Sequence, residues 1–444
     1  MPTEDAARPL SAKRSGPLKG TVRPPGDKSI SHRALMLGAL AIGETSIEGL
    51  LEGEDVLSTA EAMRAFGATV TRSGQGTWRV AGLGVGGMLE PDRVVDFGNA
   101  GTGARLTMGI AASHNFTTTF TGDASLVKRP MGRVCDPLRR MGVQILARAG
   151  DKLPATLKGP EALIPIEFRL NVPSAQVKSC VLLAALNSPG VTTIIEPTAT
   201  RDHTERMLTA FGAAIEIETA EDGSRVVRLE GGTALKPQVI VVPSDPSSAA
   251  FLIAAATLIG GSAVSILNVA ANWTRTGFIE IARRMGAPID GAIEPPGSPL
   301  TAEEPTTTLE IAHGALRGVA VEPAEIAQAI DELPLVALLG CFAEGDTVVR
   351  GAQELRVKET DRIATVVEGL GALGAAIEAT DDGFVVHGGG GLRGGVLRAH
   401  GDHRLAMLGA VAGLCSREGV EVVGLEAAAV SYPGFAGDLA RLSG

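Results

Sequence analysis

The sequence predicts an α/β protein built from six repeated units, three in each of two domains. Three observations lead to this prediction. A helix pattern that opens with small polar residues and continues with apolar ones occurs six times in the 444 residues. Each occurrence is followed by a glycine or asparagine that is expected to end the helix, here called the terminator, and then by a stretch of β-branched residues. The segments 20–31 (GTVRPPGDKSIS) and 236–248 (KPQVIVVPSDPSS) also resemble each other, as expected where a chain passes between domains.

The six first helices are the strongest repeated feature. Their patterns start at Gly26, Gly98, Val172, Val242, Ile330 and Gly401. Each runs for about 17 residues to a terminator, namely Gly43, Asn115, Gly190, Gly261, Gly345 or Gly419. Glycine and asparagine tolerate the left-handed conformation that often ends a helix, so we expect these residues to be helix C-caps.

A β-strand is predicted after each terminator, and a second helix follows in five of the six units. The strand sequences are TSIEGL, FTTTFTG, VTTIIEP, AVSILNV, TVVRGA and VEVVGL. The second helices end at Phe66-Gly67, Met141-Gly142, Phe211-Gly212, Met285-Gly286 and Leu373-Gly374, each before a further β run. The sixth unit is truncated, and we expect the N-terminal segment to complete it.

These units predict the domain boundaries. The C-terminal domain is expected to contain residues 1–22 and 243–444, and the N-terminal domain residues 23–242. Two crossings between the domains would form a hinge, so we expect closure around a ligand bound in the cleft between them.

Composition excludes several classes of protein. A net charge of −10 and an aromatic content of 3% argue against nucleic-acid binding, which uses basic patches and exposed rings. The most apolar stretch, 249–259, is too short to span a bilayer, and residues 1–15 predict a loose tail. None of the four cysteines has CxxC spacing, which is typical of buried reduced thiols in a cytoplasmic protein.

Basic residues lie near the helix starts, where the helix dipole disfavours positive charge. They are Lys28, Arg33, Arg105, Lys178 and Arg404. Each alone is most simply a solvated side chain, but their repetition at equivalent positions indicates bound anions. The run Asn99–Gly103 suits close backbone approach to an anion, although it matches neither a dinucleotide-binding loop nor a P-loop.

Other polar groups occur at matching places in the repeats. Ser29, Ser174, Ala175 and Gln176 stand at helix starts, where each serine alone would be an N-cap. Asp331 and Glu332 open the fifth helix, where carboxylates also complement the dipole. The segments RVKETDR (356–362), KRP (128–130) and TRDHTER (200–206) add further charges.

Two other kinds of site are excluded. His400, Asp402 and His403 lack the additional ligands of a metal site, and no GxSxG motif is present. The pattern therefore favours a transferase or lyase that acts on small phosphates and carboxylates.

Six motifs in colinear order resemble those of the EPSP synthases (3-phosphoshikimate 1-carboxyvinyltransferases). They are GDKSISHRAL, GNAGTGAR, the Lys-Arg-Pro loop, PSAQVKS, RVKETDR and GDHRLAM, and the resemblance runs from about residue 16 to 440. It implies the two-domain enolpyruvyl transferase fold with inside-out, barrel-like lobes. It also implies aromatic amino acid biosynthesis through chorismate, with no metal or organic cofactor.

The resemblance implies a role for each motif residue. Shikimate 3-phosphate would contact Lys28, Ser29, Arg33, Ser174, Ala175, Gln176, Arg201, Asp331 and Lys358. Phosphoenolpyruvate would contact Lys28, Gly101, Arg129, Gln176, Arg362 and Arg404. Asp331 would accept the proton of the 5-hydroxyl, and Glu359 would protonate the vinyl carbon, with Lys28 as a second catalytic group.

Two positions indicate a particular branch of this family, and a third departs from that branch. Val430 stands where many members carry a lysine, and Ala175 replaces a phosphate-binding serine, a loss for which we expect Arg201 to compensate. Both features resemble the glyphosate-tolerant, class II-like branch. Known tolerant members have alanine at the position of Gly101, so we expect this glycine to leave room for glyphosate and to make the enzyme sensitive.

Two alternative functions stay open at this point. A UDP-N-acetylglucosamine enolpyruvyl transferase has the same fold, but its characteristic loop cysteine is replaced by Ala124. A non-catalytic anion-binding relative is disfavoured because simple binding does not require both Asp331 and Glu359. We expect a cytoplasmic monomer that binds two small substrates and neither nucleic acid nor membrane.

Overall fold

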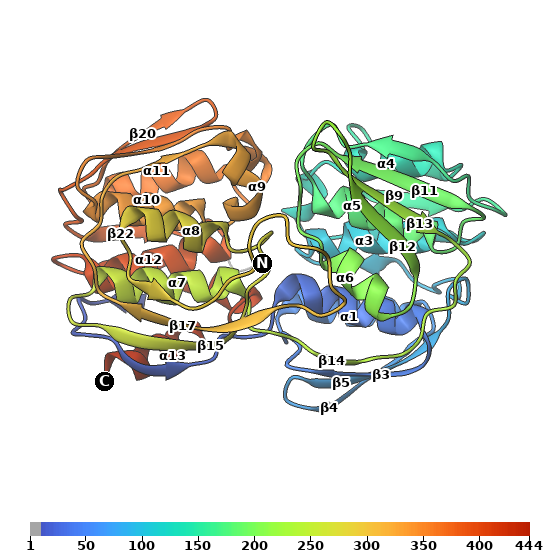
Figure 1. Cartoon of the computed structure of the whole chain (residues 1–444), viewed down its shortest axis with the longest axis horizontal. Coiled ribbons are helices and arrows are strands. Elements are labelled where there is room, and N and C mark those ends of the chain that lie inside the picture. The colour runs from blue at the N-terminus through green and yellow to red at the C-terminus, as the bar shows by residue number, and fades with distance from the viewer. Residues whose placement is uncertain (1–9) are drawn as a thin grey trace. The chain divides into compact units, whose positions relative to one another are not determined.

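The computed structural model describes residues 10–444, which divide into two compact units (Figure 1). The C-terminal unit contains residues 10–25, 243–297 and 305–444. The N-terminal unit contains Gly26–Val242 together with Ser298–Glu304. Each unit has its own continuous hydrophobic core, which is the physical mark of a separate domain.

The helices of the described residues alternate with strands along the chain. In the N-terminal unit they are α1 (Lys28–Leu40), α2 (Glu54–Ala65), α3 (Gly101–Ala112), α4 (Gly132–Arg140), α5 (Ala175–Ala185) and α6 (His203–Ala210). In the C-terminal unit they are α7 (Pro246–Leu258), α8 (Gly277–Met285), α9 (Ile326–Ala329), α10 (Leu333–Phe342), α11 (Arg362–Ala372), α12 (His403–Cys415) and α13 (Phe435–Ser443).

Six sheets form the β structure of the described residues. The N-terminal unit has the orders β14-β3-β5-β4, β6-β7-β9-β8 and β10-β11-β13-β12, and the C-terminal unit has β16-β17-β15-β2, β18-β19-β21-β20 and β1-β23-β22. Their strands in the N-terminal unit are β3 (Ile42–Glu48), β4 (Thr69–Gly74), β5 (Thr77–Leu83), β6 (Val95–Asp96), β7 (Thr117–Thr121), β8 (Gln144–Arg148), β9 (Lys152–Lys158), β10 (Glu167–Arg169), β11 (Val191–Glu196), β12 (Ala214–Thr219), β13 (Arg225–Glu230) and β14 (Val239–Val241). Those in the C-terminal unit are β1 (Leu10–Ala12), β2 (Lys19–Val22), β15 (Ala263–Ala270), β16 (Ile289–Asp290), β17 (Thr306–Ala312), β18 (Ala320–Val321), β19 (Asp346–Val349), β20 (Ala376–Thr380), β21 (Gly383–His387), β22 (Gly395–Arg398) and β23 (Val420–Val423).

The first helix of each repeat lies inside its unit, and the sheets lie outside (Figure 1). Helices α1, α3 and α5 are buried along nearly their whole length, as are α7, α10 and α12. A helix that is apolar on every side is stable only when it is surrounded by protein. Outer strands such as β5 alternate buried and exposed side chains, so one face of the sheet covers the helices. The predicted six-unit α/β fold is therefore confirmed.

The predicted helix terminators have two outcomes. After the second helices, Gly67, Gly142, Gly212, Gly286 and Gly374 all have positive φ and end the helix as predicted. After the first helices the prediction was wrong, because the C-cap residues are non-glycine and right-handed or extended. The glycines with positive φ lie a few residues later, at the entry to the next strand, and Asn115 does not adopt positive φ.

Two short strands exchange places in the repeat pattern. β2 precedes α1 in the chain but pairs with β15, whereas β14 precedes α7 but pairs with β3. Where the two connections meet within the C-terminal unit, the Asp245 amide donates to the Pro25 carbonyl at 2.9 Å, and Ser244 Oγ donates to the Pro24 carbonyl at 2.9 Å. The chain thus enters and leaves the N-terminal unit at neighbouring points of the C-terminal unit.

The N-terminal segment is ordered where the structure describes it. The predicted loose tail over residues 1–15 lies outside the described residues up to residue 9. From Leu10 onward the prediction was wrong, since β1 pairs antiparallel with β23 and completes the sixth sheet. That sheet has three strands, and its unit also contains α13, a helix that the sequence pattern did not predict.

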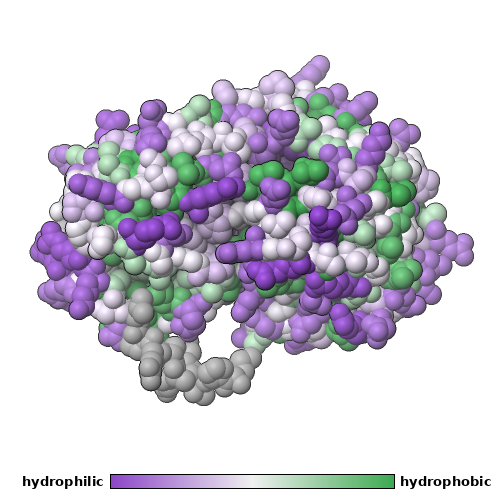
Figure 2. Space-filling view, turned by 90° about the horizontal axis from the view of Figure 1, so that it is seen from below, coloured by the Kyte–Doolittle hydropathy of each residue, from purple (hydrophilic) through white to green (hydrophobic). Residues whose placement is uncertain are grey.

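The surface carries scattered apolar residues. On the face drawn in Figure 2, hydrophobic residues occur in small groups among hydrophilic ones.

All four cysteines lie in the described part of the chain and are free thiols. From residue 10 onward, every helix is too short or too polar to cross a lipid bilayer.

Candidate active site

The first turns of the buried helices are unusual in charge. None of α1, α3, α5, α7, α10 and α12 has an acidic residue in its first turn, whereas the outer helices α2, α6, α8 and α13 do. A helix N-terminus carries partial positive charge and exposes unpaired amides. Carboxylates stand at the N-cap positions of α1, α7, α10 and α12 instead, namely Asp27, Asp245, Glu332 and Asp402. Helices α3 and α5 have no carboxylate at either place, so their N-terminal charge is left for an external anion.

Lys28 and Ser29 begin α1. The helix is capped by Asp27, whose side chain accepts from the Ile30 amide at 2.9 Å. Lys28 is paired with Asp55 of α2, and 20% of the lysine side chain is exposed. A cation that is held by one carboxylate and still reaches solvent can contact an anionic ligand.

Arg33 is buried under the start of α1. Its Nε donates to Thr204 Oγ1 at 2.7 Å, one terminal nitrogen to Ser179 Oγ at 2.7 Å, and the other to the Ser29 carbonyl at 3.0 Å. These bonds join α1, α5 and α6. Arg33 therefore fixes the neighbourhood of Ser29.

A second cluster surrounds the start of α3. Arg105 donates to Gln176 Oε1 at 3.1 Å and to the Pro130 carbonyl at 3.1 Å. Gln176 in turn donates to Thr102 Oγ1 at 2.9 Å. The buried Arg129 donates to Asn99 Oδ1 at 2.5 Å and to Ser125 Oγ at 3.2 Å. Two guanidinium groups thus lie beside the small-residue run, as an anion site there requires.

Gly101 faces both of these arginines. A methyl group added at Gly101 would lie 2.9 Å from one terminal nitrogen of Arg105 and 3.2 Å from one of Arg129. This glycine is buried and is the first residue of α3. Its lack of a side chain therefore sets the space beside the two cations.

The start of α5 and that of α6 carry the other predicted residues of this unit. Ser174 caps α5 by accepting from the Val177 amide at 3.4 Å, which agrees with the simple N-cap interpretation. Ala175 is the first residue of α5, so its amide is among those that a helix leaves unpaired. Arg201 is partly exposed and directly precedes Asp202, the N-cap of α6.

Lys178 does not face an anion site as the sequence predicted. Its amine lies 2.9 Å from Glu196 Oε2 and 2.7 Å from Glu205 Oε1, and all three side chains are completely buried. Burial, opposed by Lys178 and reinforced by Glu205, raises the pKa of Glu196. Lys178 is thus an internal structural cation.

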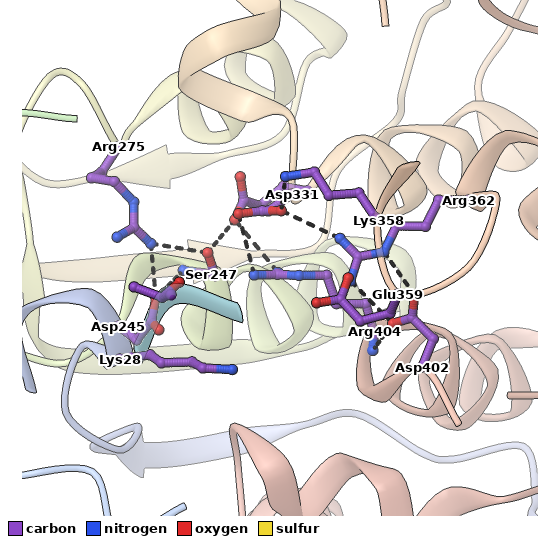
Figure 3. A network of polar contacts seen from close by, with 12 residues as sticks. Lys28, Asp245, Ser247, Arg275, Asp331, Lys358, Glu359, Arg362, Asp402 and Arg404 are labelled. Carbon is purple, nitrogen blue, oxygen red and sulfur yellow. Dashed lines mark hydrogen bonds and ion pairs between the residues drawn. The ribbon is translucent and has the colours of Figure 1, made fainter. Parts of the chain in front are cut away.

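In the C-terminal unit, five of the predicted residues lie in one network (Figure 3), namely Asp331, Lys358, Glu359, Arg362 and Arg404. Arg362 is buried and contacts three carboxylates. It lies 3.3 Å from Asp331 Oδ1 and 2.6 Å from Glu359 Oε2, and it binds Asp402 with two nitrogens at 2.8 and 3.1 Å. Lys358 donates to the same Asp331 oxygen at 3.3 Å.

Arg404 and Glu332 connect this network to a deeper one. Arg404 lies 3.7 Å from Asp331 Oδ2 and 3.6 Å from Glu332 Oε1. The buried Glu332 accepts a hydrogen bond from Ser247 Oγ. Ser247 Oγ also accepts from Arg275 at 3.0 Å (Figure 3). Asp331 thus has three cationic neighbours.

Asp402 was missed as a site residue because its motif suggested only a metal site. Its side chain caps α12 by accepting from the Arg404 amide at 2.9 Å while it binds Arg362. The spacing from Arg362 is forty residues, so no local pattern could reveal the pair. Within residues 10–444, no group of three or more potential metal-ligating side chains occurs.

The Asp402 pair predicts a pH dependence of stability. Burial opposes ionisation, but Arg362 outweighs it and holds the pKa of Asp402 below its ordinary value of 3.8. A carboxyl group with a lowered folded-state pKa stabilises the fold above its ordinary pKa, and that stability is lost as the pH falls through the lowered value. We therefore expect the difference in unfolding temperature between the wild type and Asp402→Asn to be largest above pH 3.8 and to shrink below it. Calorimetry over a pH series measures this difference, and a constant difference would contradict the assignment.

Val430 contributes no cation to either set of residues. It ends a short 3₁₀ helix (Leu425–Val430) and is partly buried.

The structure brings together Asp331, Lys358, Glu359, Arg362 and Arg404 in one unit. In the other it brings together Gly101, Arg129 and Gln176, and it ties Arg33 to Ser29.

Comparisons with known proteins identify the family of the chain. The family model for EPSP synthase (3-phosphoshikimate 1-carboxyvinyltransferase) matches residues 12–439. The 3-phosphoshikimate 1-carboxyvinyltransferase of Novosphingobium aromaticivorans is 51% identical over 434 residues, covering 96% of this chain and 98% of the relative. That of Paracoccus denitrificans is 53% identical over 430 residues, covering 96% of each chain.

Solved structures give the same result. An EPSP synthase from Acinetobacter baumannii superposes with a TM-score of 0.84 and 39% identity, covering 98% of this chain and 97% of the other. The enolpyruvyl transferase NikO from Streptomyces tendae, with a TM-score of 0.75, 20% identity and 98% of each chain covered, shares the fold. The sequence resemblance is thereby confirmed, and the chain belongs to the EPSP synthase family.

Proposed function

We propose that this chain transfers the carboxyvinyl group of phosphoenolpyruvate to the 5-hydroxyl of shikimate 3-phosphate, with release of phosphate. The observation that carries the proposal is the network around Arg362, in which Asp331 and Glu359 lie among Arg362, Lys358 and Arg404. Two carboxylates among fixed cations provide proton transfer and anion binding in one place.

The two substrates are bound by overlapping sets of residues. Shikimate 3-phosphate uses Lys28, Ser29, Arg33, Ser174, Ala175, Gln176, Arg201, Asp331 and Lys358. Phosphoenolpyruvate uses Lys28, Gly101, Arg129, Gln176, Arg362 and Arg404. Planar guanidinium groups bind carboxylate and phosphate with two parallel hydrogen bonds, which suits the three-arginine set for phosphoenolpyruvate.

The reaction proceeds by addition and elimination. Asp331, which lies among three cations, accepts the proton of the 5-hydroxyl as the oxygen attacks C2 of phosphoenolpyruvate. Glu359 delivers a proton to the vinyl CH2 carbon, which becomes a methyl group in a tetrahedral intermediate. The carboxylate form of Glu359 then takes back a methyl proton as the new double bond forms, and the C2–O bond breaks so that inorganic phosphate leaves. Lys28 assists these proton transfers.

Phosphate release tests the function directly. We expect purified protein to release phosphate only when shikimate 3-phosphate and phosphoenolpyruvate are both present. Omission of either substrate is the control, and UDP-N-acetylglucosamine as the acceptor tests the alternative transferase. Release with the nucleotide sugar, or none with shikimate 3-phosphate, would refute the proposal.

Gly101 is proposed to make the enzyme sensitive to glyphosate, although Ala175 and Val430 resemble the tolerant class II-like branch. We expect Gly101→Ala to weaken glyphosate inhibition by about 10- to 100-fold, because overpacking costs roughly 1–3 kcal/mol. The Michaelis constant for phosphoenolpyruvate should rise less, since the added methyl meets the flexible ends of Arg105 and Arg129.

Inhibition kinetics at varied phosphoenolpyruvate measure this effect. Gly371→Ala is the matched control, because a methyl group there meets no atom within 4 Å. A wild-type enzyme that binds phosphoenolpyruvate tightly and works normally in millimolar glyphosate would refute the assignment of Gly101.

We also propose that the protein acts as a cytoplasmic monomer. Four free thiols, three of them buried, support a reducing compartment. The small apolar groups on the face in Figure 2 offer no large hydrophobic surface for a partner there. Light scattering during size-exclusion chromatography tests the oligomeric state.

A further inference from the structure

Residues 298–304, here called the strap, depart from the domain pattern of their neighbours. The flanking strands β16 and β17 belong to the C-terminal unit, but the strap itself belongs to the N-terminal unit. The repeat pattern gave no indication of this excursion. The contacts of the strap explain why the chain makes it.

The strap binds the first turn of α6 through side chains. Arg206 donates to Thr301 Oγ1 at 3.0 Å and to the Glu303 carbonyl at 3.2 Å. Glu304 lies 2.9 Å from His203 Nδ1 and 3.9 Å from Arg206 Nε. His203 and Arg206 are completely or almost completely buried, and Glu304 is only 12% exposed. These are shielded polar contacts, which are stronger than exposed ones.

The same turn of α6 carries groups assigned to shikimate 3-phosphate. Arg201 stands immediately before its N-cap, Asp202, whose Oδ1 accepts from Arg206 at 3.1 Å. Thr204 accepts from Arg33 at 2.7 Å and shares a hydrogen bond with Ser179. One helical turn therefore sets the position of Arg201 through the backbone and that of Arg33 through Thr204.

We propose that Glu304 is a positioning residue for the shikimate 3-phosphate site, acting through His203 and Arg206 on the first turn of α6. The inference rests on the proposed function. Glu304 does not contact the substrate; it holds the turn in the conformation that presents Arg201 and Arg33. Because coupling between two sites is reciprocal, bound shikimate 3-phosphate must also hold the strap more firmly in place.

Steady-state kinetics of Glu304→Gln test the coupling. We expect the Michaelis constant for shikimate 3-phosphate to rise by about 5-fold or more, a usual size for coupling between sites. The turnover number and the Michaelis constant for phosphoenolpyruvate should stay near their wild-type values. Glu303→Gln is the matched control, because it makes the same charge change at an exposed side chain one residue away.

Proteolysis supplies a readout that does not depend on turnover. A Glu-specific protease cuts after Glu303, and mass spectrometry identifies that cut. Shikimate 3-phosphate should slow the cut in the wild type, while Glu304→Gln should be cut faster and lose the protection by ligand.

The outcomes separate the two hypotheses. A wild type that forms no product refutes the proposed function. In that case the protease still tests the strap: if ligand-free Glu304→Gln is cut at the same rate as the ligand-free wild type, Glu304 does not hold the strap in place. An active wild type with equal Michaelis constants in Glu304→Gln and Glu303→Gln, or with no ligand protection, overturns the positioning role alone. A lowered unfolding temperature without a change in the Michaelis constant overturns it equally.

Discussion

Replacing Asp331 with asparagine is expected to lower kcat by about 10²- to 10⁴-fold, the usual contribution of a positioned general base. Asparagine keeps the size of the side chain but cannot accept the proton of the 5-hydroxyl. Lys358 and Arg362, which both contact Asp331 Oδ1 at 3.3 Å, also lose a negative partner. Because Asp331 acts in the proton-transfer step rather than in binding phosphoenolpyruvate, we expect the change to be concentrated in kcat rather than in the Michaelis constant for phosphoenolpyruvate.

The measurement is phosphate release at saturating concentrations of both substrates. Asp381→Asn is the control, because Asp381 is an exposed carboxylate of the same unit. If Asp331→Asn keeps at least a tenth of the wild-type rate, Asp331 is not the general base.

Replacing Lys178 with methionine is expected to have the largest effect on stability. The substitution leaves Glu196 and Glu205 buried without their shared cation. Removal of one partner from a buried ion pair costs about 3–5 kcal/mol, because the stranded charge stays desolvated. Protonation would neutralise the stranded carboxylates, so the deficit should shrink as the pH falls.

Urea unfolding of the variant measures this cost. Arg79→Met is the matched control, since Arg79 pairs with Glu44 on the surface and such pairs are worth about 0–1 kcal/mol. In the triple variant Lys178→Met, Glu196→Gln, Glu205→Gln, much of the lost stability should return. Equal unfolding midpoints for Lys178→Met and Arg79→Met would show that the buried cation is dispensable.

Local patterns in the sequence were sufficient to predict the repeated fold. The apolar first helices, the strands after them and the glycines after the second helices all depend on residues close together in the chain. The first-helix terminators were misplaced because a glycine that opens a strand looks like one that ends a helix. Asn115, the one predicted terminator that is not a glycine, does not adopt the left-handed conformation that a helix C-cap of this kind requires.

The partners of the charged residues could not be predicted in the same way. Lys178 carries the sequence signal of an anion site, yet it is neutralised by Glu196 and Glu205 from later elements. Asp402 looked like part of a weak metal motif, yet its partner is Arg362. Only the folded chain determines which opposite charge lies nearest, so motifs identified the charged residues but not their pairing.

The adjacent chain connections at Pro25 and Asp245 have a practical consequence. In chain order, residues 26–242 stand between two segments of the C-terminal unit, here called the host domain, whose ends at Pro25 and Asp245 are hydrogen-bonded to each other. Domain insertion succeeds at sites of this kind, where the ends of the host lie close together. A shortened gene that joins residue 25 to residue 243 would encode the host domain with β2 still paired to β15, and the strap would then be the part left without its binding surface.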